Sequence, residues 1–457
     1  MNCTFESTMR PRFLPAFWFS LLVTLLVFAV TLDSPVLAQG KSGNAPGKNQ
    51  DKEDDDGGSD NGGSDDGDGS DPGIRYEVQV FLPPADSASS LSVRGSNNSS
   101  QVIGNYTITL EDDSYTWSAW IYDPLLDPGV AHDLNDLTTG VPAGLWIRHA
   151  SAINDSGLVA VYSIDLNQED FALYPGVVDT RGYQYHPIPT PDDLQGMAVD
   201  VNNHGDVAVF MRTDFSVSED FHSFGIFNHG LIEEGDLTNE LVTVDIPLSS
   251  QIRAFGTFLS DVVDGEMFVV TNNADYDPIR FEVFSGSLET LESDVTESGT
   301  DTIFDSPDAA NRLGDFSGKY LIREYHHRNG RILSADRRIY LHTSVTEVDM
   351  ESGLDRVSDL NSSRDILGAE AGSDPIWRST LLLHRERGRF SITSLIDETT
   401  DDTGLFAERI SWGGRRLSER DLVTDFPVVV GTFALDEGAI GPINRYGALL
   451  IPFVPAE

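Results

Sequence analysis

The apolar residues of the chain fall into short segments rather than long runs. From about residue 74 to residue 457, segments rich in Val, Ile, Phe and Tyr alternate with Gly, Asp, Asn and Pro, and no stretch keeps a helical period with capping residues. Short β-branched and aromatic segments bounded by turn residues are typical of strands. The pattern therefore predicts an all-β domain over residues 74–457.

One turn element recurs through this domain, with an apolar lead-in, Asn-x-x-Gly or a variant, and a further apolar run. Five copies are SNNSSQVIG (96–104), INDSGLVAV (153–161), VNNHGDVAV (201–209), ANRLGDFSG (310–318) and LNSSRDILG (360–368). Their first Asn residues stand at positions 97, 154, 202, 311 and 361, so one copy is missing from the long third gap. We place degenerate copies at VVDGEMFVV (262–270) and, with Ser in place of Asn, at LSERDLVTD (417–425).

A second element follows each turn, and it also occurs seven times. The copies are SAWIYDP (118–124), FALYPG (171–176), FGIFNHG (224–230), FEVFSG (281–286), IYLHTS (339–344), LLLHRERG (381–388) and ALLIPF (448–453). A third element, which often ends in an Asp-Leu pair, follows the first six of them. The domain is therefore built from seven units of about fifty residues.

Each unit is expected to be one small antiparallel sheet. Asn and Gly adopt positive φ at low cost, so we expect Asn-x-x-Gly to close a hairpin between the lead-in strand and the apolar run. A run such as LVAVY, apolar at consecutive positions, is typical of a strand covered on both faces. Sheets that need like neighbours on both sides predict a seven-bladed β-propeller, with six or eight blades as alternatives.

The ends of the domain predict how the ring closes. The last copy of the second element is followed only by VPAE, so the final blade lacks a strand, whereas YEVQVFL (76–82) is a strand without a blade. We expect the N-terminal strand to complete the last blade, because this pairing removes an exposed sheet edge. Val78 or Val80 should then lie beside residues 449–451.

The turn and the strand that follows it resemble the HAF-type extracellular repeat of bacterial secreted proteins. The resemblance covers most of residues 76–457, and residues 153–161 and 201–209 carry it best. It implies a secreted, propeller-like protein, and it supplies no catalytic residues. The fourth and seventh copies depart from the pattern.

The N-terminal region predicts export followed by a spacer. Arg10 and Arg12 precede an apolar stretch that ends in Val-Leu-Ala, which indicates a signal peptide over residues 1–38 with cleavage after Ala38; the alternative is an uncleaved membrane anchor. Residues 39–73 are rich in Gly, Ser and Asp and predict a disordered acidic linker. Asp66, Asp68, Ser70 and Glu77 have the spacing of a calcium loop.

The calcium interpretation of the linker is weak because Asp71 and Pro72 stand where a calcium loop needs its glycine and the residue after it. We expect an unstructured spacer, with weak polyvalent cation binding as the alternative. The formal charge is −44, and most of the 74 acidic residues lie outside the linker. Such a surface repels nucleic acid and anionic membranes.

The sequence contains no motif for a specific reaction. The single cysteine, Cys3, lies in the signal peptide, and nucleophile-elbow, His-Glu-x-x-His and phosphate-loop motifs are missing. We expect His326 and His327 to lie on an exposed hairpin. Paired carboxylates for glycan cleavage carry no weight in so acidic a chain.

Tryptophan and tyrosine residues suggest a sugar-stacking surface only weakly. Trp117, Trp120 and Tyr122 alternate along one predicted strand, and we expect them to pack between blades, as do Trp146, Trp377 and Trp412 at blade junctions. Stacking against a sugar is the alternative for the first three. We therefore assign no catalytic, cofactor-binding or metal-binding residue.

Two classes of function compete. We expect a secreted, monomeric, non-catalytic binding module for an extracellular protein or polysaccharide, without cofactor, nucleic acid or stable membrane insertion, exported from a bacterial cell and located outside it, at its surface or in the periplasm. The alternative is a secreted propeller enzyme, a glycan hydrolase or lyase with carboxylates at the axial mouth. Fold class does not decide between them. Three or more convergent acidic, His or Arg residues in a deep axial pocket would reverse the preference for the binding module and favour the enzyme.

Overall fold

The structure is a computed structural model of the chain, whose contacts divide it into Met1–Asp66 and Gly67–Glu457. It describes residues 73–84, 91–109, 115–166, 172–191, 194–212, 222–228, 241–244, 256–259, 267–272, 278–282, 287–291, 293, 300–325, 332–343, 347–350, 354–370, 380–406, 409–435 and 445–455. The predicted signal peptide and nearly all of the acidic linker lie outside these residues. Of the residues considered for a calcium loop, only Glu77 is described.

Six sheets contain four antiparallel strands each, taken in chain order. The first three are β2 (Ser92–Ser96), β3 (Val102–Thr109), β4 (Tyr115–Tyr122) and β5 (Ala131–Asp133); β6 (Leu145–Ile153), β7 (Leu158–Asp165), β8 (Leu173–Asp179) and β9 (Gln184–Pro187); and β10 (Gln195–Val201), β11 (Asp206–Arg212), β12 (His222–Asn228) and β13 (Leu241–Val244). The next three are β14 (Gly256–Leu259), β15 (Met267–Asn272), β16 (Pro278–Glu282) and β17 (Leu288–Thr290); β18 (Thr300–Ala310), β19 (Phe316–Tyr325), β20 (Ile332–His342) and β21 (Glu347–Met350); and β22 (Leu354–Leu360), β23 (Ile366–Glu370), β24 (Thr380–His384) and β25 (Gly388–Ser391).

The seventh sheet draws strands from both ends of the domain. It contains β27 (Arg409–Arg420), β28 (Pro427–Leu435), β29 (Arg445–Phe453), β1 (Arg75–Phe81) and the short β26 (Ile396–Asp397). The described helical turns are α2 (Leu134–Leu137), α4 (Ile392–Leu395) and η1 (Glu398–Thr400). Within the described part of the chain, no helix is both long and apolar enough to cross a membrane.

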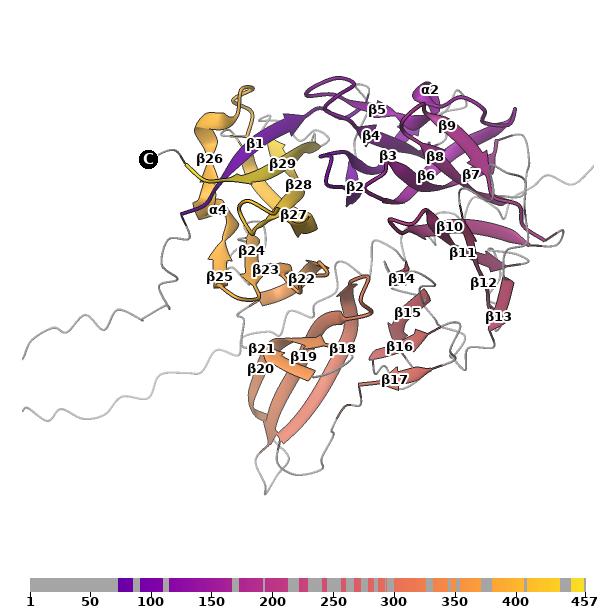
Figure 1. Cartoon of the computed structure of the whole chain (residues 1–457). Coiled ribbons are helices and arrows are strands. Elements are labelled where there is room, and N and C mark those ends of the chain that lie inside the picture. Colours follow the sequence, from indigo (N-terminus) through magenta and orange to yellow (C-terminus); the bar gives the residue numbers. More distant parts are fainter. Residues whose placement is uncertain are drawn as a thin grey trace, which may run out of the picture. The chain divides into compact units, whose positions relative to one another are not determined.

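The seven sheets form a ring of blades. The first strand of each sheet contacts the first strand of the next, in the order β2, β6, β10, β14, β18, β22 and β27, and β27 contacts β2. These strands therefore surround the axis, with the other strands of each blade outside them (Figure 1). The predicted seven-bladed β-propeller is confirmed.

The ring closes by pairing β1 with β29, as predicted. All seven residues of β1 have partners, and Val78 faces Leu450 while Val80 faces Ala448. In Figure 1 the indigo strand β1 lies beside the yellow strand β29. Glu77, which had been considered as a calcium ligand, is a strand residue paired with Ile451. The N-terminal strand is thus an integral part of the last blade.

The core consists of layers between neighbouring blades. Along β7, Val159 and Val161 pack with Ile103 of the first blade, whereas Leu158 and Ala160 pack with the third blade. Successive side chains of a strand point to opposite faces, so a strand in the middle of a blade must be apolar at consecutive positions. This confirms the interpretation of the apolar runs.

Candidate functional site

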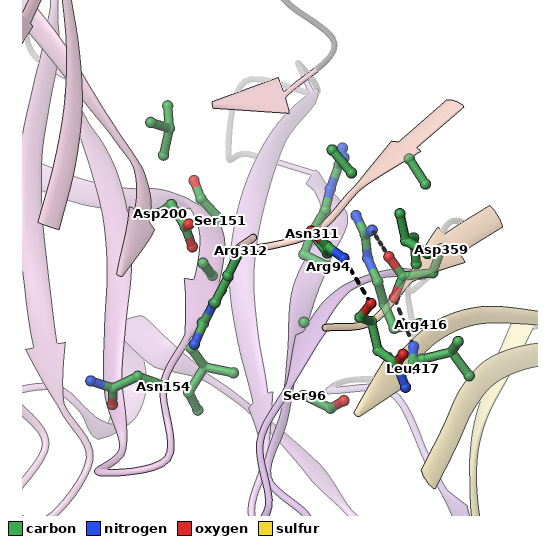
Figure 2. Close-up of a pocket in the computed structure, with 18 of the residues that line it drawn as sticks. Arg94, Ser96, Ser151, Asn154, Asp200, Asn311, Arg312, Asp359, Arg416 and Leu417 are labelled. Atoms are coloured by element: carbon green, nitrogen blue, oxygen red, sulfur yellow. Dashed lines mark hydrogen bonds and ion pairs between the residues drawn. The ribbon is translucent and has the colours of Figure 1, made fainter. Parts of the chain in front are cut away.

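The innermost strands enclose a cavity of about 710 Å³ along the axis. Its lining comes from β2, β6, β10, β18, β22 and β27, with contributions from β7, β11, β12 and β15 (Figure 2). Exposed Asn98, Asp155 and Asn203 border it, so this end meets solvent. The volume falls in the range of small-ligand pockets.

A β-bulge in each described innermost strand except β14 directs side chains toward this cavity. The pairing shifts by one residue at Arg94, Ser151, Val199 and Asp308, always three positions before the Asn of the turn. All four residues line the cavity. A bulge bends its strand and re-aims a side chain, which explains why non-repeated residues of different blades converge.

Arg94 and Arg416 form the cavity wall between the first and seventh blades. Figure 2 shows the two side chains running alongside each other. Arg416 Nη1 lies 3.2 Å from Asp359 Oδ1, and Asp359 Oδ2 also accepts a 2.7 Å bond from Leu417 N–H. Arg94 has no hydrogen-bond or ion-pair partner among the described residues. Arg94 is exposed to solvent, but desolvation by the atoms around its guanidinium group, and then the charge of Arg416, lower its pKa.

Burial dominates the electrostatics of Asp359. It raises the pKa of this carboxyl group, while Arg416 and the backbone donors oppose the rise. The complete lining has four arginines and five acidic residues, but this part of the wall holds two guanidinium groups and one carboxylate and so carries a local excess of positive charge. The excess is notable because the whole chain has 30 Lys and Arg residues against 74 acidic residues.

His149 and Tyr162 lie next to Arg94. Their rings stack with centroids 4.9 Å apart and an angle of 8° between the planes. Burial, with smaller contributions from Arg94 and Arg148, lowers the pKa of His149 to about 3, so the imidazole is neutral at physiological pH. Burial also raises the pKa of Tyr162.

Two polar atoms near Arg94 are buried without a hydrogen-bond partner in the described part of the chain. They are His149 Nδ1 and Ser96 Oγ, and both residues line the cavity. Buried polar atoms in proteins nearly always have partners, so each exception needs an explanation. Two of these exceptions therefore lie in the lining of one cavity, and one of them, His149, is close enough to Arg94 for the charge of Arg94 to lower its pKa.

Arg312 projects into another part of the cavity. It comes from the fifth blade, and its Nη2 donates a 3.0 Å hydrogen bond to the carbonyl oxygen of Val201 in the third blade. Figure 2 places it on the side of Asp200 and Asn154, apart from Arg94 and Arg416. Arg312 therefore joins two blades that are not neighbours.

The repeated Asn residues connect neighbouring blades at one end of the cavity. Asn97 Nδ2 donates to Asn154 O at 3.0 Å, and Asn154 Nδ2 donates to Asn202 O at 2.7 Å. In the same direction, Asn311 donates to Asn361 O and Asn361 donates to Ser418 O. The Oδ1 of each Asn accepts backbone N–H groups of its own turn, as with Leu158 N–H at 2.8 Å. The Asn side chain thus shapes a turn and binds the next blade.

This role corrects the reason given for Asn in the turn. Positive φ falls three residues later, on Gly157, Gly205 and Gly314 and, where glycine is missing, on Ser100 and Arg364. An amide is needed because it both accepts and donates. Residues 361–363, Asn-Ser-Ser, also have the form of an N-glycosylation sequon, but Asn361 is buried in this network, so turn chemistry explains the pattern.

The seventh turn also differs from the prediction. Ser418 does accept the amide of Asn361, but it lies within β27, and the hairpin closes later, where Asp421 N–H donates to Phe426 O at 3.0 Å. Asp425 takes the positive φ. The bulges in β27 displace the hairpin from the aligned position.

The predicted aromatic residues do not form one surface. Trp120 and Tyr122 are buried and pack on Phe81, which confirms packing between blades, but Trp117 is 39% exposed. Positions 117 and 120 differ by an odd number, so they face opposite sides of β4. Trp146 is half-buried on β6, and the side chain of Trp412 is not among those described.

His326, His327 and Trp377 lie outside the described residues. Within the described ranges, no group of three or more His, Cys, Asp or Glu residues has an arrangement that would hold a metal ion. The arginines of the cavity were missed because they belong to no motif. The one feature of the sequence that could have indicated a cavity residue is the position three residues before the repeated Asn, where the strand bulges. Arg94 occupies this position in the first blade.

The fold and the cavity define a seven-bladed β-propeller with a polar axial channel. Structures to which the chain is similar include the β-propeller domain of the Trilobed protease from Pyrococcus furiosus, with a TM-score of 0.44, 10% identity, and coverage of 81% of this chain and 93% of that one. An ancestral GH74 enzyme has a TM-score of 0.41, 10% identity, and coverage of 82% and 48%. Polysaccharide lyase Uly1 has a TM-score of 0.38, 10% identity, and coverage of 83% and 98%. No family model and no curated protein matches the chain.

Proposed function

We propose that the protein is a secreted, non-catalytic binding module that takes part of an extracellular polysaccharide into its axial channel. The observation that supports this most directly is the cavity of about 710 Å³, which opens among exposed polar residues and contains polar groups without partners. A pocket with a few convergent polar groups is the usual form of a small-ligand site. The HAF-type resemblance and the predicted signal peptide support the extracellular setting.

The alternative is a glycan-cleaving enzyme, and the convergence of Arg94, Arg312, Arg416, Asp359 and His149 on the cavity favours it. This is the arrangement that we set as the criterion for an enzyme. An efficient general acid or base needs a pKa near the working pH and a free oxygen or nitrogen. Burial raises the pKa of Asp359 toward that range, but both of its carboxylate oxygens are bonded, to Arg416 Nη1 and to Leu417 N–H, which favours binding instead. The pKa of His149 is about 3, and that of Tyr162 is raised above its ordinary value.

A screen of the purified protein against polysaccharides and cell-envelope extracts separates the two proposals. Retention on a glycan should be scored independently of the release of reducing or unsaturated ends. We expect binding without cleavage. Cleavage that a single substitution such as Asp359→Asn abolishes, while the protein still melts at the same temperature, would place the protein among the enzymes.

Secretion is tested separately by N-terminal sequencing of the protein recovered outside the cytoplasm. We expect a chain that begins near Gln39. A chain that keeps Met1 or Met9 and fractionates with the membrane would overturn this part of the proposal.

A further inference from the structure

We propose that the cavity wall formed by Arg94, Ser96, His149 and Arg416 binds an acidic group of a short glycan, a carboxylate or a sulfate. This inference deepens the proposed binding function and rests on it. The wall is assembled from innermost strands of the first, second and seventh blades, so it exists only in the closed ring.

The first step is that the wall is positively charged and incompletely paired. Arg94 has no hydrogen-bond or ion-pair partner among the described residues, and the ion pair of Arg416 with Asp359 involves only Nη1. Each guanidinium group has five N–H donors in a planar fork. Donors therefore remain for a ligand on two adjacent side chains.

The second step concerns the neighbours of these arginines. His149 adds no charge because it is neutral, and its buried Nδ1 has no partner in the described part of the chain; the same is true of Ser96 Oγ. An oxyanion accepts several hydrogen bonds at once and pairs with guanidinium groups in a bidentate manner. An oxyanion would therefore accept hydrogen bonds from the free donors of this wall and also neutralise its excess positive charge.

The third step is the choice of a glycan rather than an acidic protein. A cavity of about 710 Å³ accommodates a few sugar rings and excludes a folded domain. Ser151 and Arg312 are among the residues that line the remainder of the cavity, and their hydroxyl and guanidinium groups are of the kind that bind sugar hydroxyls. The acid group would lie against Arg94 and Arg416, with neutral rings toward these residues.

The fourth step limits the length of the ligand. A net charge of −44 repels a long polyanion before it reaches the channel. A short chain, or a chain end with one acid group, meets much less repulsion. Added salt screens the repulsion, so association of acidic ligands should become faster at moderate ionic strength.

The test compares four ligands by calorimetry on the whole protein: a galacturonate trisaccharide, a sulfated trisaccharide, the matching neutral galactose trisaccharide, and inorganic sulfate. We expect the acidic sugars to bind more tightly than the neutral sugar and than inorganic sulfate. Arg94→Gln should weaken the acidic sugars about tenfold or more, the usual consequence of losing charge-assisted hydrogen bonds. The matched control is Arg181→Gln, because Arg181 pairs with Asp179 on an outer turn and does not line the cavity; it should leave binding unchanged.

The melting temperature without ligand provides the second readout. Because Arg94→Gln removes repulsion between two guanidinium groups, the variant should melt at the same temperature or higher. Unchanged binding by Arg94→Gln, binding by none of the acidic ligands, or a clearly lower melting temperature would overturn the inference.

Equal affinity for neutral and acidic sugars would overturn the inference and leave the binding module intact. Inorganic sulfate that binds as tightly as the sugars would show an anion site without a glycan. Cleavage of any sugar would overturn the proposed function, whatever its charge preference.

Discussion

Blades 1 to 3 and blades 5 to 7 use the same turn in the same place but join neighbouring blades by different chemistry. In the first group, Gln101, four residues after Asn97, donates to Asp123 Oδ2 at 2.8 Å and reaches Thr180 of the second blade at 3.4 Å. In the second group, the corresponding Asp315 and Asp365 are fully buried and pair with Arg364 and Arg420 of the following blade. Arg420 donates two hydrogen bonds of 2.8 Å to Asp365, from Nε to Oδ2 and from Nη2 to Oδ1.

The comparison shows that the amide contact is common to both groups, whereas the residue four positions after the Asn makes a neutral contact at Gln101 and an ionic contact at Asp315 and Asp365. Removal of one partner of a buried ion pair leaves an unpaired charge, which is far more destabilising than the loss of a neutral hydrogen bond. The two halves of the ring should therefore respond differently to substitution.

The largest loss of stability should come from opening the ring between the last blade and the first blade. Deletion of residues 74–83 removes β1, which pairs along its whole length with β29. In β1, Tyr76 OH also donates to Pro427 O, and Val78 N–H donates to Thr400 Oγ1. At about 1 kcal/mol net per lost hydrogen bond, the loss approaches the whole stability of a typical domain. We expect aggregation or a much lower melting temperature in calorimetry and size-exclusion chromatography.

Deletion of residues 39–72 provides the control for this experiment. It should leave the melting temperature nearly unchanged. A stable, monomeric protein without residues 74–83 would contradict the closure of the ring by β1.

The second largest effect should come from Arg420→Met. It leaves the buried carboxylate of Asp365 without its bidentate partner, which costs about 3–5 kcal/mol. Urea unfolding should show this loss, and addition of Asp365→Asn should recover a large part of it. If the single variant is as stable as the parent protein, the ionic contact does not hold these blades.

A smaller effect is expected for Asn154→Ala, the corresponding break in the neutral half. The substitution removes the bond to Asn202 O and leaves Leu158 N–H without its acceptor, a loss of about 1–3 kcal/mol. Asn361→Ala should be milder, since Arg420 still connects the sixth and seventh blades. Equal losses in chemical denaturation would show that the two halves do not differ in this way.

The effect that is smallest at neutral pH, and that grows as the pH falls, concerns His149. The folded-state pKa of His149, about 3, lies below its ordinary value, so the unfolded chain binds the additional proton between about pH 6.5 and pH 3. The contribution of this residue to stability is complete above pH 6.5 and declines as the pH falls through that range. His149→Phe, which keeps the stacking on Tyr162, should flatten the melting temperature against pH in this window. An unchanged slope would assign the acid sensitivity to other groups.

Much of the fold could be predicted because it depends on local patterns repeated along the chain. The apolar runs give the middle strands of the blades, the turns give their number, and the unpaired strand at residues 76–82 gives the closure. The bulges were not predictable, because they appear only as a shift in pairing between two strands.

The candidate site was less predictable, for a physical reason. The side-chain amide of Asn154 donates to a carbonyl oxygen 48 residues away in the chain. Arg94 and Arg416 lie close together only after the ring has closed. A repeated Asn is visible in one sequence, but its donor role requires the neighbouring blade. The exposure of Trp117, in contrast, could have been predicted from the sequence. Trp117 and Trp120 are three positions apart in one strand, so their side chains lie on opposite faces of β4.

The pairing of β1 with β29 also sets the order in which the protein folds. Arg75 pairs with Phe453, so the contact with the greatest separation in the chain forms between its two ends. Contacts of large sequence separation form slowly, because long loops must close first. The first six blades are continuous segments and can each form while the chain is still being synthesised. The last blade is incomplete until Phe453 has emerged, and until then β1 presents an open edge to any other extended chain. The rate-limiting step of folding should therefore be the docking of β1, and this is the interval in which the protein is most exposed to aggregation and to chaperones.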